Sequence, residues 1–333
     1  MNIKKYKTKL LLTILSIVLS AGIITGCGED ASSGKFVALT NKGDQILYST
    51  DGISWSVSTL PNTDSNTIWN SVCYGDGKFV AIGYDSTRRI VTYSTDGIDW
   101  KPPKPLPGNN TAWISICYGN GKFVAVGIAD PSYAAASYST DGINWTLGTG
   151  LVGWELRNVC YGNGMFVAVC DEIIAYSTDG ITWTSENTME AWNSGCYGKG
   201  RFVLIADNYT AYSTDRTTWI SKTGPSGSWG NICYGNGTFI AVGENRNTAA
   251  YSTDGINWQN TTMSISIHWW YSVCYGNGKF IAVGYRDHPV STPKIGIAAS
   301  SADGIHWEEI KLPISTPLGS ITYGFDKDIF GFL

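Results

Sequence analysis

Seven copies of one short motif run through this chain of 333 residues, and they constrain its fold more than any other feature. Each copy is a variant of Ser-Thr-Asp-Gly-Ile-x-Trp, and successive copies are 36 to 49 residues apart. Self-similarity with a period in this range indicates an array of supersecondary units. The motif tryptophans are Trp55, Trp100, Trp145, Trp183, Trp219, Trp258 and Trp307.

The second repeat shows what one unit contains. Its apolar runs 71–75 and 78–83 are joined by Asp76-Gly77, a pair typical of a type I′ hairpin, because both turn positions need positive φ. A third run, 90–94, follows a loop, and a fourth run begins at the motif tryptophan. We therefore expect four antiparallel strands in each repeat. No sustained helical periodicity follows the N-terminal leader, so the chain should be all-β.

Four short strands in each of seven repeats fit the blades of a β-propeller. The expected fold is a seven-bladed β-propeller of four-stranded antiparallel blades over residues 34–333. The first repeat lacks an innermost strand, and residues 320–324 have the matching sequence. We expect this C-terminal strand to pair into the first blade and close the ring, which removes exposed sheet edges. Residues 325–333 resemble a further second strand, so an eighth blade and a frayed tail stay open as alternatives.

The motif Ser-x-Asp-Gly-x-x-Trp resembles the Asp-box (BNR) repeat of sialidases, sortilin-like receptors, xyloglucanases and the photosystem II assembly-factor propellers. The box here has one residue fewer between Asp and Trp than the usual form. The resemblance covers nearly all of the chain after its leader, and it implies a propeller. It implies no particular activity, because the repeat is scaffold in each of those families.

The motif aspartates are expected to be structural turn residues. A carboxylate at this position accepts hydrogen bonds from the N–H groups of its own turn, and the following glycine takes positive φ. The motif tryptophan should bury a large surface between sheets. The fifth repeat has Arg216 in place of the glycine, so its turn should be strained or reshaped. The seven aspartates are Asp51, Asp96, Asp141, Asp179, Asp215, Asp254 and Asp303.

Residues 1–26 have the pattern of a bacterial lipoprotein signal peptide. Four lysines precede an apolar stretch over 10–25 that ends in Gly26-Cys27. This ending resembles the lipobox, in which the cysteine is lipid-modified and becomes the mature N-terminus. We expect lipidation of Cys27, a short tether over 27–33, and anchoring on the extracytoplasmic side of the cell membrane. An uncleaved anchor helix is the alternative, and it gives the same side of the same membrane.

Composition narrows the partners and cofactors. Without the four leader lysines, 19 basic and 27 acidic residues leave a formal charge of −8, so we expect no nucleic-acid binding, and we expect a monomer. Six cysteines occupy equivalent positions in neighbouring repeats, on the order of 10 Å apart, beyond the roughly 7 Å that a disulfide spans. We expect free buried thiols, and neither a metal site nor a cofactor. The six are Cys73, Cys117, Cys160, Cys196, Cys233 and Cys274.

Ligand recognition is expected where the repeats differ. The first-to-second and third-to-fourth turns are nearly identical, whereas the second-to-third connections and the links between repeats vary in length. Variable loops on a rigid ring are where repeat proteins place recognition, and we call this end of the sheets the loop face. A second set of tryptophans precedes the innermost strands. They either pack under the loops or form an aromatic platform for a sugar or peptide. The candidate ligand-binding residues are Trp69, Trp113, Trp154, Trp192, Trp229, Trp269, Trp270, His268 and Arg246.

Three functions are compatible with this pattern. We expect a surface-facing binding or scaffold propeller without catalysis, whose ligand is a glycan, a wall polymer or a protein. A sialidase-like glycoside hydrolase is the second possibility, and it would need an arginine triad and a Tyr–Glu pair. The Arg-Ile-Pro signature expected before the first box is absent, although several arginines could reach the loop face. An extracytoplasmic assembly factor is the third, but the arginine-rich patch of the photosystem II factors is missing. The loop-face arginines are Arg88, Arg89, Arg157, Arg246 and Arg286.

Overall fold

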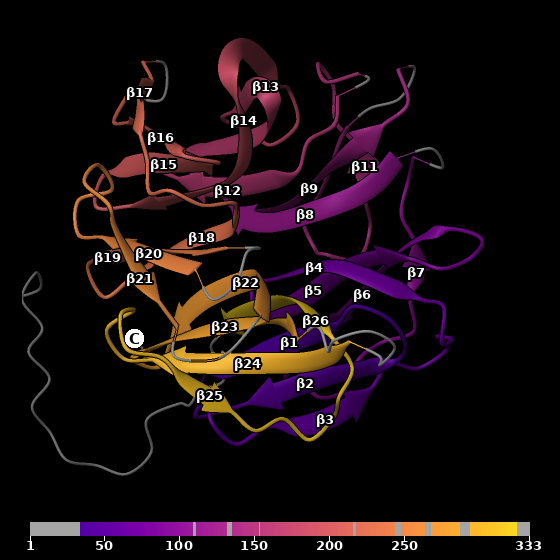
Figure 1. Ribbon diagram of the computed structural model, residues 1–333. Coiled ribbons are helices and arrows are strands. Elements are labelled where there is room, and N and C mark those ends of the chain that lie inside the picture. Colours follow the sequence, from indigo (N-terminus) through magenta and orange to yellow (C-terminus); the bar gives the residue numbers. More distant parts are fainter. Residues whose placement is uncertain are drawn as a thin grey trace, which may run out of the picture. The chain divides into compact units, whose positions relative to one another are not determined.

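The structure is a computed structural model in which the chain from Gly34 to Gly324 forms 26 β-strands in six antiparallel sheets (Figure 1). The sheets follow one another around a ring, with one strand of each repeat innermost. This is a β-propeller. The described residues are 34–108, 111–131, 135–152, 154–215, 218–243, 248–263, 265, 268–286 and 294–324.

Three sheets, ordered from the innermost strand outward, come from the first three repeats. Their strands are β26 (Leu318–Gly324), β1 (Lys35–Thr40), β2 (Gln45–Ser49) and β3 (Ser56–Thr59); β4 (Ile68–Gly75), β5 (Lys78–Tyr84), β6 (Arg89–Ser94) and β7 (Lys104–Pro105); and β8 (Thr111–Gly119), β9 (Lys122–Ala129), β10 (Ala136–Ser139) and β11 (Thr146–Leu147).

The other three sheets come from the remaining four repeats. Their strands are β12 (Asn158–Gly162), β13 (Met165–Ser177), β14 (Thr184–Gly198), β15 (Arg201–Ala206), β16 (Tyr209–Ser213) and β17 (Ile220–Thr223); β18 (Trp229–Gly235), β19 (Thr238–Gly243), β20 (Thr248–Ser252) and β21 (Gln259–Thr262); and β22 (His268–Gly276), β23 (Lys279–Arg286), β24 (Ile295–Ser301) and β25 (Glu308–Ile310).

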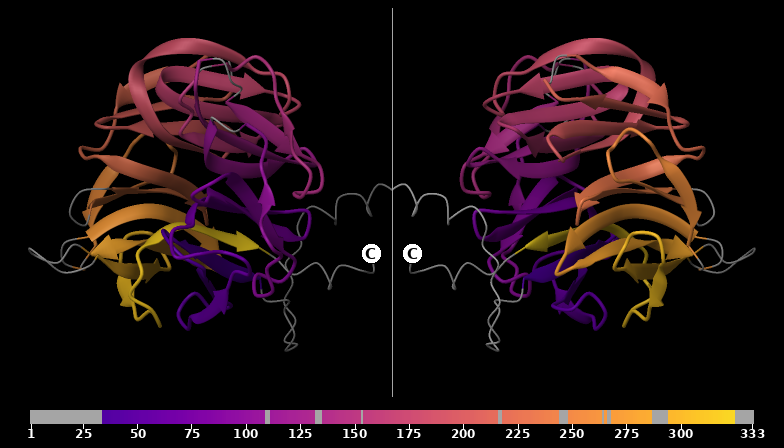
Figure 2. Two further views of the ribbon diagram at one scale, coloured as in Figure 1. Left: turned by 90° about the vertical axis from the view of Figure 1, so that its right-hand side faces the viewer. Right: turned by 90° about the vertical axis from the view of Figure 1, so that its left-hand side faces the viewer.

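The prediction of seven separate four-stranded blades is wrong, because the described residues form six sheets and the fourth and fifth repeats share one of them. β13 runs through both the second and third strands of the fourth repeat. β14 runs from the outermost strand of that repeat directly into the innermost strand of the next. The connections here are too short to leave the sheet. They bend at register shifts beside Asp171 and Trp192, and Glu172 takes a φ of 58°. Figure 2 shows the pink strands of this part of the chain curving over the top of both views.

The predicted closure by the C-terminal strand is confirmed. β26 pairs antiparallel with β1, with Lys35 opposite Gly324 and Val37 opposite Thr322. β1 thereby becomes an interior strand of a four-stranded sheet, and its edge is no longer available to another chain. β26 also contacts β4 and β22, the innermost strands on either side of it.

A belt of polar side chains links the innermost strands. Ser71 Oγ accepts a hydrogen bond from the Ile116 N–H of the next strand at 3.3 Å, and equivalent side chains do the same around the ring. Ser194 departs from this pattern and accepts from the Asn231 side-chain amide at 3.3 Å. These bonds give buried N–H groups a partner that the sheet ladder does not supply. The belt residues are Ser71, Ser115, Asn158, Ser194, Asn231, Ser272 and Ser320.

Neighbouring repeats are held together by a repeated aromatic contact. The ring of Tyr118 lies against Gly75 of the preceding strand, where a Cβ would come within 2.0 Å of the Tyr118 ring. The same tyrosine packs against Phe123 of its own hairpin, with ring centroids 4.7 Å apart. Side chains larger than hydrogen at the glycine would push the two repeats apart, which explains why Tyr-Gly recurs at the end of each innermost strand.

The turns of the repeated motif have the geometry that the sequence predicts. Asp141 Oδ1 accepts hydrogen bonds from the N–H groups of Ile143 and Asn144, both at 2.8 Å, and from the Ser139 hydroxyl at 2.9 Å. Burial disfavours the ionised Asp141, but these hydrogen bonds outweigh it and hold the pKa of the carboxyl well below its usual range. Gly142 takes a φ of 74°. In the fifth repeat Asp215 keeps its bond from Thr218 N–H, whereas Arg216 lies outside the described residues.

The six equivalent cysteines and Cys170 are free thiols in the structure. Each of the six packs into the interface between repeats, and burial raises the pKa of the Cys160 thiol to about 12. Such thiols carry almost no thiolate at neutral pH, so they behave as small apolar side chains. Among the described residues, no helix has the length and apolar character needed to cross a membrane.

Candidate functional site

The link between the last repeat and the closing strand crosses the seam of the ring. Residues 311–317 connect β25 to β26 and lie between β24 and the β1–β2 loop. The Ser315 carbonyl accepts a hydrogen bond from Gly296 N–H at 2.7 Å, and the Pro317 carbonyl accepts one from Asn41 N–H at 2.8 Å. A Cβ on Gly296 would lie 2.0 Å from the Thr316 carbonyl oxygen. The link is therefore fixed to both neighbouring sheets at the loop face.

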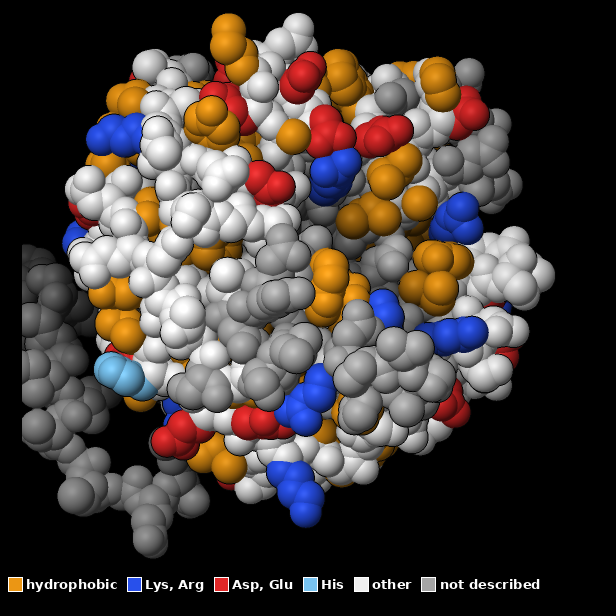
Figure 3. Space-filling view, viewed as in Figure 1, with side chains coloured by type: hydrophobic (Ala, Val, Ile, Leu, Met, Phe, Trp, Pro, Cys, Tyr) orange, Lys and Arg blue, Asp and Glu red, His pale blue; other side chains and the backbone are white. Residues whose placement is uncertain are grey.

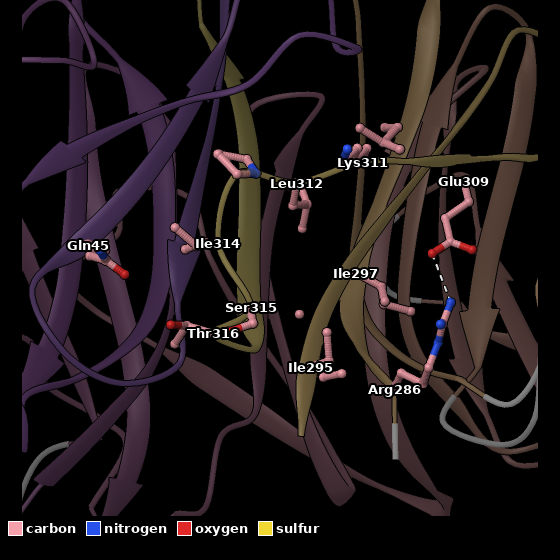
Figure 4. A pocket seen from close by; sticks show the side chains of 13 residues that line it. Gln45, Arg286, Ile295, Ile297, Glu309, Lys311, Leu312, Ile314, Ser315 and Thr316 are labelled. Atoms are coloured by element: carbon pink, nitrogen blue, oxygen red, sulfur yellow. Dashed lines mark hydrogen bonds and ion pairs between the residues drawn. The ribbon is translucent and has the colours of Figure 1, made fainter. Parts of the chain in front are cut away.

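A cavity of about 640 Å³ opens beside this link, within the range usual for ligand sites (Figure 4). Leu312 points into its centre, and Ile295, Ile297 and Ile314 point toward the same space from both sides. Leu312, Ile314 and Ile295 are half-buried, so apolar surface faces the cavity. The lining residues are Gln45, Arg286, Ile295, Gly296, Ile297, Glu309, Ile310, Lys311, Leu312, Pro313, Ile314, Ser315 and Thr316.

One rim of this cavity is an ion pair. Arg286 at the end of β23 donates from Nη2 to Glu309 Oε1 of β25 at 2.8 Å. The two side chains are 34% and 45% exposed. Solvent therefore screens their attraction, and the pair adds little to the stability of the fold. The pair could still contact a ligand, because it places the N–H donors of a guanidinium group next to a carboxylate acceptor.

A second cavity of about 590 Å³ meets the first at Thr316. Its walls are the β1–β2 loop and the link before β4, and Gly43 N–H bonds the Thr67 carbonyl at 2.8 Å across them. We call the two cavities together the seam groove. The lining residues of the second cavity are Asn41, Lys42, Gly43, Asp44, Thr63, Asp64, Ser65, Lys294, Thr316 and Pro317.

An aromatic stack adjoins the seam groove. Trp269 and Tyr285 are paired across β22 and β23, with ring centroids 6.1 Å apart and planes 9° from parallel. Tyr271 packs against the same tyrosine at 5.4 Å, and Lys294 places its Nζ 4.0 Å from that ring's centroid. Because Lys294 also lines the second cavity, the stack supports one wall of the groove.

Five tryptophans of the predicted platform are core residues, so the platform prediction is wrong for them. Each is at most 1% exposed and cannot offer a ring face to a ligand. In two of them the indole N–H donates to a carbonyl of the preceding link, Trp113 to Pro107 at 3.0 Å and Trp229 to Pro225 at 3.1 Å. Packing under the links thus explains their recurrence. The five are Trp69, Trp113, Trp192, Trp229 and Trp270.

The remaining predicted site residues fall into three groups. Trp154 and Trp269 are half-buried at the loop face, Trp154 against the core of the third and fourth repeats and Trp269 in the aromatic stack. Cys27 and Arg246 lie outside the described residues. His268 begins β22, where its backbone is opposite Arg286.

The described loop-face arginines come from three repeats, and each has a partner. Arg88 pairs with Asp85, Arg157 with Asp171 at 2.6 Å, and Arg286 with Glu309. Arg89 donates to the Thr111 carbonyl at 2.9 Å. Three of these partners lie in the arginine's own repeat, and the partner of Arg89 lies in the next sheet.

Sequence reasoning missed the seam groove. Its floor comes from Leu312 and Ile314, which flank Pro313 in a link between repeats rather than in a strand. The available signal was this apolar content in a solvent-facing link with Pro313 and Pro317.

Comparison with known proteins gives the fold but no family. No protein-family model matches the chain, and no curated protein sequence matches it. Among solved structures it is similar to YCF48 bound to D1 peptide, at 18% identity over 76% of this chain and 94% of that one, with a TM-score of 0.57. YCF48 is a β-propeller, and this chain has the same architecture.

Two further structures are similar at 12% identity. A catalytically inactive virginiamycin B lyase from Staphylococcus aureus with quinupristin has a TM-score of 0.62 over 77% of this chain and 93% of that one. The computationally designed Ika8 protein has a TM-score of 0.54 over 85% and 98%. Identities this low support the shared architecture alone, because one fold hosts unrelated functions.

Proposed function

We propose that this chain is a binding propeller, anchored by lipid on the extracytoplasmic side of a membrane, that holds an extended polypeptide segment in the seam groove. The observation that carries the proposal is the groove itself. Two cavities joined at Thr316 form an elongated site with an apolar floor and charged rims.

The lining chemistry favours a polypeptide. Half-buried Leu312 and Ile314 offer pockets for apolar side chains, and alternate side chains of an extended peptide point the same way. The rims carry both signs, with Lys42, Lys294 and Lys311 on one hand and Asp44 and Asp64 on the other. Rims that carry both charges favour a peptide whose own charges are placed opposite them, rather than any peptide of a given net charge.

The fold comparison lends support of a limited kind. YCF48, a propeller of similar architecture, was solved with a peptide bound. A propeller of this size can therefore present a peptide site. The hydrolase alternative has less support, because the described loop-face arginines come from three repeats and each is bound to another residue. The assembly-factor alternative requires the same binding of a protein segment, so the experiment below tests its first step.

The anchoring part rests on the leader. We propose that residues 1–26 are removed, that Cys27 carries the lipid, and that residues 27–33 tether the propeller. The basic leader, the apolar stretch and the Gly-Cys ending together support this proposal.

A random-peptide phage selection against the protein purified from membranes tests the groove. Peptides should be recovered that bind the parent protein, and Leu312→Asp should weaken them at least tenfold, about 1.4 kcal/mol, by placing a charge on the apolar floor. Ile53→Asp is the matched control, because Ile53 is 53% exposed in a motif turn at the opposite end of the sheets. No selected peptide, or peptides indifferent to Leu312→Asp, would refute the peptide groove. A glycan array run in parallel reveals whether sugars bind instead.

A further inference from the structure

We propose that the six-stranded sheet carries a second docking surface, centred on Met189, for a basic polypeptide segment with apolar side chains. This surface is built from β14 to β17 and lies in different repeats from the seam groove. It is independent of the proposed function and would stand if the seam groove bound nothing.

Met189 is the most exposed large hydrophobic side chain among the described residues, at 92%. It lies in β14, a strand of 15 residues, at the register shift between Asn187 and Ala191. Two contacts fix the backbone on either side of it. Ala191 is paired with Asp171 of β13, and the buried Trp192 donates from its indole N–H to Thr188 Oγ1 at 3.0 Å. The exposed methionine is thus held in place by the sheet beneath it.

A cavity lies on each side of Met189 and Glu190. One has a volume of about 370 Å³ and reaches Tyr209 at the start of β16, which is 46% exposed. The other has a volume of about 360 Å³ and reaches the motif tryptophan Trp219. Ile220, beside that tryptophan, is also 46% exposed. Apolar side chains therefore form a ridge with a hollow on either flank, which suits alternate side chains of an extended segment.

Charge identifies the occupant. Three carboxylates line the two hollows, from Glu186, Glu190 and Asp207. Arg157 is the cation among the lining residues, and Asp171 already binds it at 2.6 Å. With β13 and β14 at the top of the view, Figure 3 shows acidic side chains among hydrophobic ones over this part of the molecule. A segment that combines lysine or arginine with apolar residues matches both properties.

Glu186 adds a second reason for a cationic ligand. Burial raises the pKa of its carboxyl, and the nearby Trp219 indole N–H opposes that rise. Glu186 Oε1 and Trp219 Nε1 are both buried, and within the described residues neither has a partner at full hydrogen-bond geometry, so the indole lies near the carboxyl without satisfying it. Because Glu186 lines this hollow, an ammonium or guanidinium group of a ligand there could pair with its carboxylate.

Fluorescence anisotropy tests the surface with the full protein and a short labelled peptide rich in lysine and leucine. A matched peptide with glutamate in place of lysine should not bind. Glu190→Lys should weaken binding at least tenfold by reversing one charge on the ridge. Met189→Ser should weaken it several-fold without altering the fold, because the side chain makes little contact with the core.

Two controls make the result specific. Glu308→Lys reverses an exposed acid of β25 in another repeat, and Leu312→Asp alters the seam groove. Both should bind the lysine-leucine peptide as the parent does. Equal losses in Glu308→Lys and Glu190→Lys would reduce the binding to general attraction by an acidic protein and overturn the proposal. Undetectable binding to the parent, or no effect of Met189→Ser, would overturn it as well.

Discussion

Gly324 packs so closely against Tyr74 that a Cβ on the glycine would lie 2.2 Å from the tyrosine's Cδ2. This contact closes the series in which the tyrosine of one repeat covers the glycine of its neighbour. Because Gly324 belongs to the C-terminal strand and Tyr74 to the second repeat, the ring is sealed by the same contact that joins its interior repeats.

Gly324→Ala should destabilise the protein by about 1–3 kcal/mol, because the added methyl group overpacks the closure. Urea unfolding should show a lower midpoint. Tyr74→Ala makes room for the methyl group, so the double variant should lose less stability than the two single losses added together. Strictly additive losses would mean that the two residues do not constrain one another.

The polar belt predicts a cost for removing a single hydroxyl. Ser71→Ala leaves the buried Ile116 N–H without its acceptor and should cost about 1–3 kcal/mol. Ser56→Ala, at an exposed position of β3, is the control and should change the unfolding midpoint little. Equal midpoints for the two variants would show that water replaces the hydroxyl in the belt.

The motif aspartates predict acid sensitivity. Hydrogen bonds lower the folded-state pKa of Asp141, and those of the equivalent carboxylates in Asp51, Asp254 and Asp303, below the ordinary 3.8. Their contribution is therefore complete above the unfolded-state pKa and is lost as pH falls through the folded-state value. Thermal stability should be level at neutral pH and should fall as pH drops below about 4.

An asparagine substitution isolates one aspartate in that pH profile. Asp141→Asn should lower the free energy of unfolding by on the order of 1 kcal/mol at pH 7. The loss should be much smaller at pH 2, because most of the stability that the ionised carboxyl gives the parent is gone at that pH. Melting curves at both pH values measure the difference. A gap between parent and variant that is as wide at pH 2 as at pH 7 would argue against charge-assisted capping.

The proposed anchor is tested by Cys27→Ala. The parent should sediment with membranes and incorporate labelled palmitate, and its mature N-terminus should begin at the modified cysteine. The variant should lose the label and keep an unprocessed leader, because processing at a lipobox depends on the cysteine. Identical labelling and N-terminal mass in both proteins would favour the uncleaved anchor helix.

The repeat made most of the fold predictable. The Asp-Gly and Asn-Gly hairpins are confirmed, with Asn120 and Gly121 at φ of 46° and 72°. The pairing of the C-terminal strand with β1 follows from a missing segment and its match. Merging of two repeats could not be predicted in the same way. It depends on whether a short connection leaves the sheet or bends within it, and the residues around Asp171 permit both.

The candidate site was much less predictable. The second set of tryptophans was easy to recognise because it recurs in the repeats. A residue that recurs at each link is explained by packing under that link, as it is for buried Trp113 and Trp229. The seam groove and the Met189 surface lie where the ring departs from its repeat. Leu312 lies in the link that leads into the closing strand, and Met189 lies where two repeats are fused.

The unbroken course of β14 has a consequence for how such a ring can be rearranged. Residues Gly34 and Gly324 lie beside each other, so new termini could be opened in a loop between repeats while the old ends are joined. β14 offers no such loop, and a break there would divide a strand. We expect circular permutants opened at the other links to fold and those opened within β14 to fail. For duplication, deletion or recombination, the fourth and fifth repeats should behave as one module.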